Sequence, residues 1–122
     1  MTPTPLALVA DDEPSLRSLL ATFLGHEYAV VAVADGEQAY RALLADPAPA
    51  VAVLDCDMPG LSGPDALARA RAAGCRVPVL LVSGSSDPPD ALSGDPRAAF
   101  LAKPFTRTQL LGAVSALVAP TG

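Results

Sequence analysis

The sequence lacks several features that define other classes of protein. It has no tryptophan, only two cysteines (Cys56 and Cys75), and no apolar run near the ~20 residues that cross a bilayer. Two cysteines are too few for a disulfide framework, and no basic region precedes an apolar one at the N-terminus. These absences predict a cytoplasmic protein in a reducing environment, with no membrane association.

Basic residues are also scarce: eight Lys and Arg face thirteen Asp and Glu, and the net charge is −5. Binding to nucleic acid normally needs a basic surface that displaces counterions from phosphates. The acidic balance therefore predicts no direct DNA binding, and it favours a cation or a basic protein surface as the partner. Lys103 is the single lysine, and His26, the single histidine, is expected at the surface.

The length of 122 residues suits one domain with its own core. We expect a single domain over 1–122, with a core at about 6–118 and short tails at 1–5 and 119–122. Met1 and the short tails favour a stand-alone protein over a fragment of a larger one.

Short apolar runs alternate with amphipathic segments along the chain. The apolar runs are 6–10, 50–54, 79–82 and 99–102, with a further strand-like segment at 28–34. Runs of this length between turns predict strands buried on both faces of a parallel sheet. Helices are predicted from Pro14 to before Gly25, then over 37–45, 64–73 and 106–118, the last opened by a Thr106–Gln109 capping box.

The alternation predicts an α/β fold with right-handed crossovers, five strands and about five helices. Two helices have clear apolar stripes: Leu16, Leu19, Leu20, Phe23 and Leu24 in the first, and Leu110, Leu111, Val114, Leu117 and Val118 in the last. The segment 84–98 is rich in proline and has little helical periodicity. At most a short or irregular helix is expected there, around Asp90–Leu92.

Polar residues follow four of the apolar runs: Asp11 and Asp12, Asp55, Ser83, and Lys103. Because ligands bind off the carboxyl ends of parallel strands, these residues are expected to share one crevice. Three converging carboxylates repel one another unless a cation offsets the charge, and Mg²⁺ suits carboxylate oxygens best. The alternative for Asp11–Asp12 is a solvated helix N-cap.

The same residues favour phosphoryl transfer. An aspartate such as Asp55 can act as a nucleophile and form an acyl phosphate. Lys103 can supply a positive charge to a phosphoryl oxygen, and Ser83 can supply a hydroxyl donor.

Four sequence elements in order carry a resemblance to a known family: Asp11–Asp12, the run from Asp55 to Gly63, Ser83–Gly84, and Lys103–Pro104–Phe105. The chain resembles the receiver domain of bacterial two-component response regulators over nearly its whole length. The resemblance implies a flavodoxin-like, doubly wound parallel sheet with strand order 2-1-3-4-5.

The resemblance also implies that Asp55 accepts a phosphoryl group from a sensor histidine kinase or a phosphotransfer protein. Mg²⁺ would be held by Asp11, Asp12, Asp55 and the backbone carbonyl of Asp57. The protein would be a phosphoacceptor switch that catalyses its own phosphorylation and dephosphorylation, and not a metabolic enzyme. It would act on a downstream protein target as a monomer or weak dimer.

Further roles are implied around the phosphoryl group. Lys103 and Ser83 would contact it as catalytic residues, and Ser83 and Phe100 would form the conformational switch. The Lys103–Pro104 peptide bond would be cis. Phe100 replaces the commoner tyrosine, and Asp57 adds a negative charge near the acceptor, so Asp57→Asn is expected to change the lifetime of the phosphorylated form.

Two other functions remain as alternatives. Asp55-x-Asp57, Ser83 and Lys103 are also similar in order to the motifs of haloacid-dehalogenase-type phosphatases, in which Asp57 would be a general acid. The mid-chain position of the motif and the absence of a cap domain argue against that reading. The irregular segment 84–98 leaves open a receiver-like module that binds proteins without phosphate.

Overall fold

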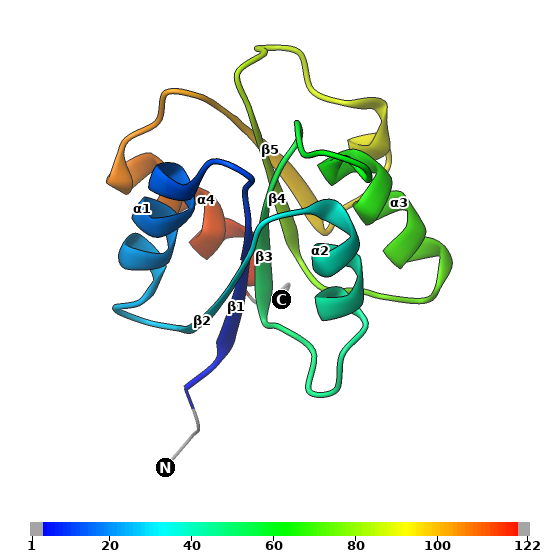
Figure 1. Cartoon of the computed structure of the whole chain (residues 1–122), viewed down its shortest axis with the longest axis horizontal. Helices are drawn as coiled ribbons and strands as arrows, with labels where there is room; N and C mark the ends of the chain where they lie inside the picture. The colour runs from blue at the N-terminus through cyan, green and yellow to red at the C-terminus, as the bar shows by residue number, and fades with distance from the viewer. Residues whose placement is uncertain (1–3, 120–122) are drawn as a thin grey trace.

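Five parallel strands form one sheet in the order β2-β1-β3-β4-β5 in the computed structural model, which describes residues 4–119 (Figure 1). The strands are β1 (Leu6–Ala10), β2 (Ala29–Val33), β3 (Val51–Asp55), β4 (Val79–Ser83) and β5 (Ala98–Ala102). The predicted fold class and strand order are therefore confirmed. Residues 1–3 and 120–122 of the predicted tails lie outside the described residues.

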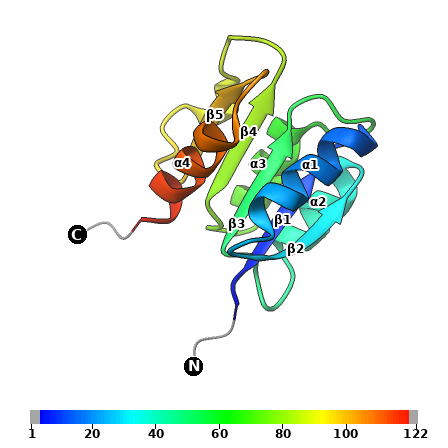
Figure 2. The ribbon, with the colours of Figure 1, turned by 90° about the vertical axis from the view of Figure 1, so that its left-hand side faces the viewer.

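Four helices cover the sheet: α1 (Pro14–Leu24), α2 (Gly36–Leu43), α3 (Gly63–Ala72) and α4 (Arg107–Val118). Helices α1 and α4 lie on one face, and α2 and α3 lie on the other (Figure 2). The capping box predicted at the start of α4 is present. Between β4 and β5 only one short 3₁₀ helix, η1 (Asp90–Leu92), forms, as the irregular sequence of this segment predicts.

Apolar side chains of the central strands alternate between two cores. Leu8, Leu54 and Leu81 pack toward α2 and α3, whereas Val9, Val53 and Leu80 pack toward α1 and α4. Every residue of β3 and β4 is buried. This burial explains why these runs carry no polar residue before their last position.

The predicted helix stripes are wider than the observed contact faces. Leu19 is 45% exposed, and Leu20 and Leu24 are the buried residues of α1, because consecutive helical positions differ by about 100° around the axis. Val118, also predicted inward, is exposed near the end of α4. Among residues 4–119, no helix has the length and apolarity that a membrane span requires.

Candidate functional site

The predicted site residues come together at the carboxyl edge of the sheet. Asp11 and Asp12 follow β1, Asp55 ends β3, Ser83 ends β4, and Lys103 follows β5. The register pairs Ala10 with Leu54, Asp55 with Val82, and Ser83 with Ala102, so the strands end at nearly the same level. Strands of equal length thus align residues that are far apart in the sequence.

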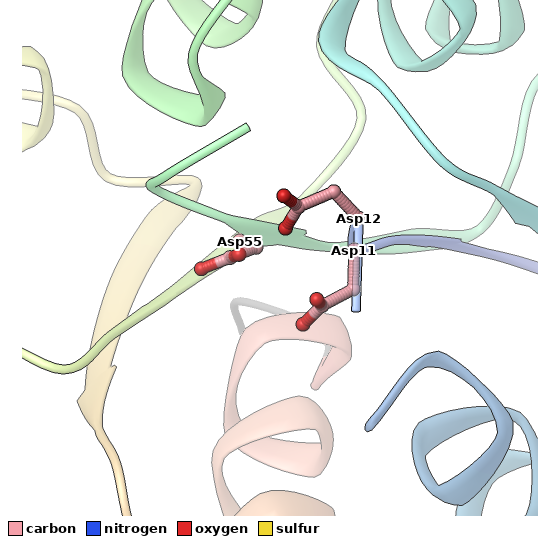
Figure 3. A group of neighbouring side chains, drawn as sticks. All are labelled: Asp11, Asp12 and Asp55. Atoms are coloured by element: carbon pink, nitrogen blue, oxygen red, sulfur yellow. The ribbon is translucent and has the colours of Figure 1, made fainter. Parts of the chain in front are cut away.

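Three carboxylates form the centre of the site. Asp11, Asp12 and Asp55 each place one carboxylate oxygen within 4.8 Å of the others (Figure 3). Asp11 is 0% exposed and Asp55 is 3% exposed, whereas Asp12 is open to solvent. Charges this close and this poorly hydrated require a compensating cation.

Lys103 supplies one such cation. Its Nζ donates a hydrogen bond to Oδ1 of Asp55 at 3.1 Å and lies 3.8 Å from Oδ2 of Asp11. The Lys103 side chain is 26% exposed, so the ammonium group reaches the carboxylates from the rim of the site. One lysine therefore faces two buried carboxylates.

The two oxygens of Asp11 have different surroundings. Oδ1 accepts a hydrogen bond from the backbone N–H of Glu13 at 2.9 Å, whereas buried Oδ2 has no hydrogen-bond partner among the described residues. Burial, and next the nearby charge of Asp55, raise the pKa of Asp11 above its ordinary value against the opposing effect of the Glu13 N–H. An unpartnered buried oxygen beside two further carboxylates fits the oxygen donor set of Mg²⁺.

The backbone ties the β4 and β5 ends of the site together. The carbonyl of Ser83 accepts a hydrogen bond from the N–H of Lys103 at 2.7 Å, and the Ser83 hydroxyl accepts one from Ser85 N–H at 3.1 Å. Ser83 is buried, and the Lys103–Pro104 peptide bond is cis. Ser83 and Lys103 are consequently held next to each other at the rim.

Gly63, at the start of α3, packs directly on the backbone of Asp55. A Cβ at this position would lie 2.3 Å from the Asp55 carbonyl oxygen, a distance that no side chain tolerates. The Gly63 N–H donates to the carbonyl of Cys56 at 3.3 Å. Gly60, in the same loop, has φ +74°, a conformation that favours glycine, so both glycines serve the geometry of this loop.

Other predicted residues lie around this centre. The side chain of Asp57 is exposed in the loop after β3 and is outside the group of three carboxylates. Phe100, on β5, is half-buried and packs against the α2–α3 core, as do Ala91 and Leu92 of η1. His26 is exposed in the turn between α1 and β2, as predicted.

One contact at the site was not predicted. Nη1 of Arg17, in the first turns of α1, donates to the backbone carbonyl of Asp11 at 3.0 Å and fixes the end of β1. Its sequence signal is weak: an arginine six residues after Asp11, on a helix with no other charged residue.

Comparison with known proteins identifies the family. Residues 7–115 match the response regulator receiver domain. The chain belongs to this family. It is therefore a receiver domain of two-component signal transduction, a phosphoacceptor switch and not a classical enzyme.

Relatives of this receiver domain are longer proteins. The chain is 36% identical over 113 residues to the transcriptional regulatory protein TcrA of Mycobacterium tuberculosis, and covers 44% of it. It is 32% identical over 112 residues to the DNA-binding response regulator MtrA of Mycolicibacterium smegmatis, and covers 48% of it. The two alignments include 90% and 89% of this chain. Because they cover 44% and 48% of the relatives, the chain spans about half the length of these curated proteins.

A solved receiver-domain structure shares the fold of this chain. The receiver domain of the sensor histidine kinase PA1611 from Pseudomonas aeruginosa PAO1 matches with a TM-score of 0.77 and 29% identity, over 97% of this chain and 100% of that one. That structure has a magnesium ion coordinated in its active-site cleft. The corresponding acidic cluster is present in this chain.

These comparisons correct one sequence prediction and exclude one alternative. The prediction of no direct DNA binding is wrong, because relatives of this chain are transcriptional regulators and one of them is named as DNA-binding. The prediction used the net charge of these 122 residues. That charge gives no information about the remaining half of relatives such as MtrA, which this chain does not match. The haloacid-dehalogenase alternative is excluded by membership of the receiver family.

Proposed function

We propose that Asp55 is the phosphoacceptor, and that it receives the phosphoryl group from a phosphohistidine of a sensor histidine kinase or phosphotransfer protein. The observation that supports this most directly is the 3.1 Å contact between Lys103 Nζ and Asp55 Oδ1 beside two further carboxylates. A carboxylate with an adjacent fixed cation is arranged for phosphoryl transfer, which depends on positioning and charge neutralisation.

In the proposed transfer, an oxygen of Asp55 forms the new bond to phosphorus. The phosphorus–nitrogen bond of the phosphohistidine breaks, and the electron pair leaves with the imidazole nitrogen. Lys103 loses its contact with a free carboxylate and contacts a phosphoryl oxygen instead. In a separate hydrolysis step, an oxygen of water forms a bond to the phosphorus, and the bond between phosphorus and the Asp55 oxygen breaks. Inorganic phosphate leaves and the Asp55 carboxylate is restored; in this proposal the domain catalyses both its phosphorylation and its dephosphorylation.

Asp11, Asp12 and Asp55, with the backbone carbonyl of Asp57, would hold Mg²⁺. When bound, the ion supplies positive charge that offsets the carboxylates and the phosphoryl oxygens. The unpartnered Oδ2 of Asp11 supports this assignment, because a buried acceptor without a donor is unusual unless an ion or water completes it.

Phosphorylation would change partner binding through Ser83 and Phe100. The Ser83 hydroxyl, now bound by Ser85 N–H, would turn to donate to a phosphoryl oxygen, and Phe100 on the neighbouring strand would repack. We propose that residues 1–122 act as one such domain, whose output passes to a protein target.

The test is the intact mass of the protein after incubation with Mg²⁺ and acetyl phosphate. One acid-stable, base-labile phosphate is expected on the wild type and on Asp65→Asn, an exposed control in the first turn of α3, but not on Asp55→Asn. Omission of Mg²⁺ should abolish the adduct. Absence of any adduct, and of beryllofluoride binding, would favour the module that binds proteins without phosphate.

A further inference from the structure

Two adjoining hollows lie at the amino edge of the sheet, opposite the carboxylate site. One has a volume of about 290 Å³ and the other about 560 Å³, and both are lined by Arg76, Pro96 and Arg97. These residues immediately precede β4 and β5, whereas Asp55 and Lys103 lie at the carboxyl ends. Strands of five residues separate the two edges by roughly 16 Å.

Arg71 of α3 holds the walls of these hollows in place. Its guanidinium donates to Asp95 Oδ2 at 2.9 Å and to the carbonyls of Cys75, Val77 and Arg97 at 3.2, 2.8 and 3.2 Å. The other carboxylate oxygen of Asp95 accepts the N–H of Arg97 at 2.9 Å. The guanidinium of Arg71 therefore makes its hydrogen bonds and its ion pair within the fold. These contacts fix the loops before β4 and β5.

Arg76 and Arg97 are different, because both are exposed and neither side chain forms an ion pair or hydrogen bond within residues 4–119. They lie in the two loops that Arg71 ties together, so their backbone positions are fixed before any ligand arrives. Two unpaired arginines that line the same two hollows form a local positive site in a protein of net charge −5. An anionic group is the natural complement, and a carboxylate can pair with a guanidinium through two hydrogen bonds.

The larger hollow adds apolar surface to these charges. It runs from Pro78 and Pro96 to Leu117 and Val118 at the end of α4, and Val118 is an exposed large apolar residue. We call this hollow, with Arg76 and Arg97 at its rim, the basal groove. A small inorganic anion would satisfy the arginines but would leave the apolar part uncovered.

We propose that the basal groove binds an acidic, partly apolar peptide segment of a protein partner. Carboxylates of the segment pair with Arg76 and Arg97, and neighbouring apolar side chains cover Pro78, Leu117 and Val118. The combination of exposed positive charges with apolar lining residues matches the usual anatomy of a protein interface. The groove is independent of the proposed phosphorylation of Asp55, so either proposal can fail without the other.

The test is selection of random short peptides displayed on phage against the immobilised wild-type protein. Enriched peptides are expected to carry Asp or Glu next to apolar residues. The affinity of a synthesised enriched peptide should fall about tenfold or more in the Arg76→Gln/Arg97→Gln variant. The matched control Arg41→Gln/Arg107→Gln removes the same charge from exposed residues elsewhere and should bind as the wild type does.

Amide and arginine side-chain NMR shifts locate the bound peptide. Shifts confined to 74–78, 95–97 and 117–119 support the proposal. Failure to enrich acidic peptides, shifts elsewhere, or equal loss of affinity in both double variants would overturn it. If millimolar inorganic phosphate alone produces the same shifts and displaces the peptide, the groove is a small-anion site and the peptide proposal is wrong.

Discussion

The ammonium group of Lys103 lies 3.1 Å from Oδ1 of Asp55 but 3.8 Å from Oδ2 of Asp11, and only the Asp55 contact is a hydrogen bond. One lysine therefore compensates two buried carboxylates unequally. Asp55 has its cation already in place, whereas Asp11 keeps an oxygen without a donor. The first three predictions below follow from this asymmetry.

Replacement of Asp11 by asparagine should stabilise the protein in metal-free buffer. The substitution removes a buried charge whose Oδ2 has no hydrogen-bond donor and only a 3.8 Å contact with Lys103 Nζ, so the free energy of unfolding is expected to rise by about 1–2 kcal/mol. Millimolar Mg²⁺ should stabilise the wild type and leave Asp11→Asn unchanged. Urea unfolding with and without Mg²⁺ measures both effects; a variant less stable than the wild type without metal contradicts the prediction.

The stability difference between these two proteins should depend on pH. Burial raises the pKa of Asp11 above 3.8, so the folded state binds this proton more tightly than the unfolded state does. In metal-free buffer, stability due to Asp11 is therefore full below pH 3.8 and is lost as the pH rises through the raised pKa. The advantage of Asp11→Asn should grow over this window; a constant advantage across it would show that the carboxyl is not perturbed.

Replacement of Lys103 by methionine should have the opposite effect. It leaves Asp11 and Asp55 buried without a cation, and we expect a loss of about 1–3 kcal/mol, less than for a fully buried pair because the lysine is partly exposed. Mg²⁺ should restore part of the loss. In a second variant that also carries Asp55→Asn, the cost of Lys103→Met should be smaller; equal costs would mean that the ion pair contributes nothing.

Asp57→Asn should lengthen the life of the phosphorylated form, by about tenfold or less. Asp57 is exposed two residues after the proposed acceptor, where its carboxylate can orient an attacking water. Loss of the phosphorylated mass with time after removal of acetyl phosphate measures the rate. Asp65→Asn is the control, and identical decay in all three proteins would remove any role for Asp57.

Replacement of Gly63 by alanine should disturb the site through the backbone of Asp55. Gly63→Ala places a Cβ against the Asp55 carbonyl oxygen, so overpacking is expected to cost about 1–3 kcal/mol and to lower the yield of the phosphate adduct. Gly112→Ala is the matched control within α4, where nothing lies within 4 Å of the new Cβ. This control should gain about 0.5–1 kcal/mol, because alanine favours the helix.

The two cysteines should react with a thiol reagent at very different rates. Burial, and then the charges of Asp55 and Asp57, raise the pKa of Cys56 to about 11, and its side chain is buried. At pH 8 about a thousandth of Cys56 is thiolate, so the folded protein should show one fast thiol, the half-buried Cys75. Cys75→Ser should abolish the fast phase; a fast phase that survives would mean that Cys56 is open to solvent.

The strands and the carboxylate site could be predicted because four of the five strands end at a polar residue or directly before one. The run from Val51 to Leu54 has no polar residue, and Asp55 follows at once, so periodicity and chemistry define the same boundary. Parallel pairing then requires such residues to meet at one edge.

Contacts made between distant side chains could not be predicted in this way. Arg71 reads as a surface residue of α3, yet its guanidinium bridges two loops, because the loop before β5 brings Asp95 beside it. Leu19 fits the helical stripe of α1 but faces solvent, since it lies about 100° around the helix axis from buried Leu20. The wrong prediction about DNA binding has another origin. It used the net charge of these 122 residues, and that charge does not describe the rest of longer relatives.

The position of β5 at the edge of the sheet has a consequence for motion. β5 is paired on one side only, with β4, and all five of its residues are partly exposed, whereas every residue of β4 is buried. Its amide hydrogens should therefore exchange with solvent through local opening well before those of β3 and β4. The strand that carries Phe100 and leads to Lys103 is thus among the elements that need the least free energy to rearrange.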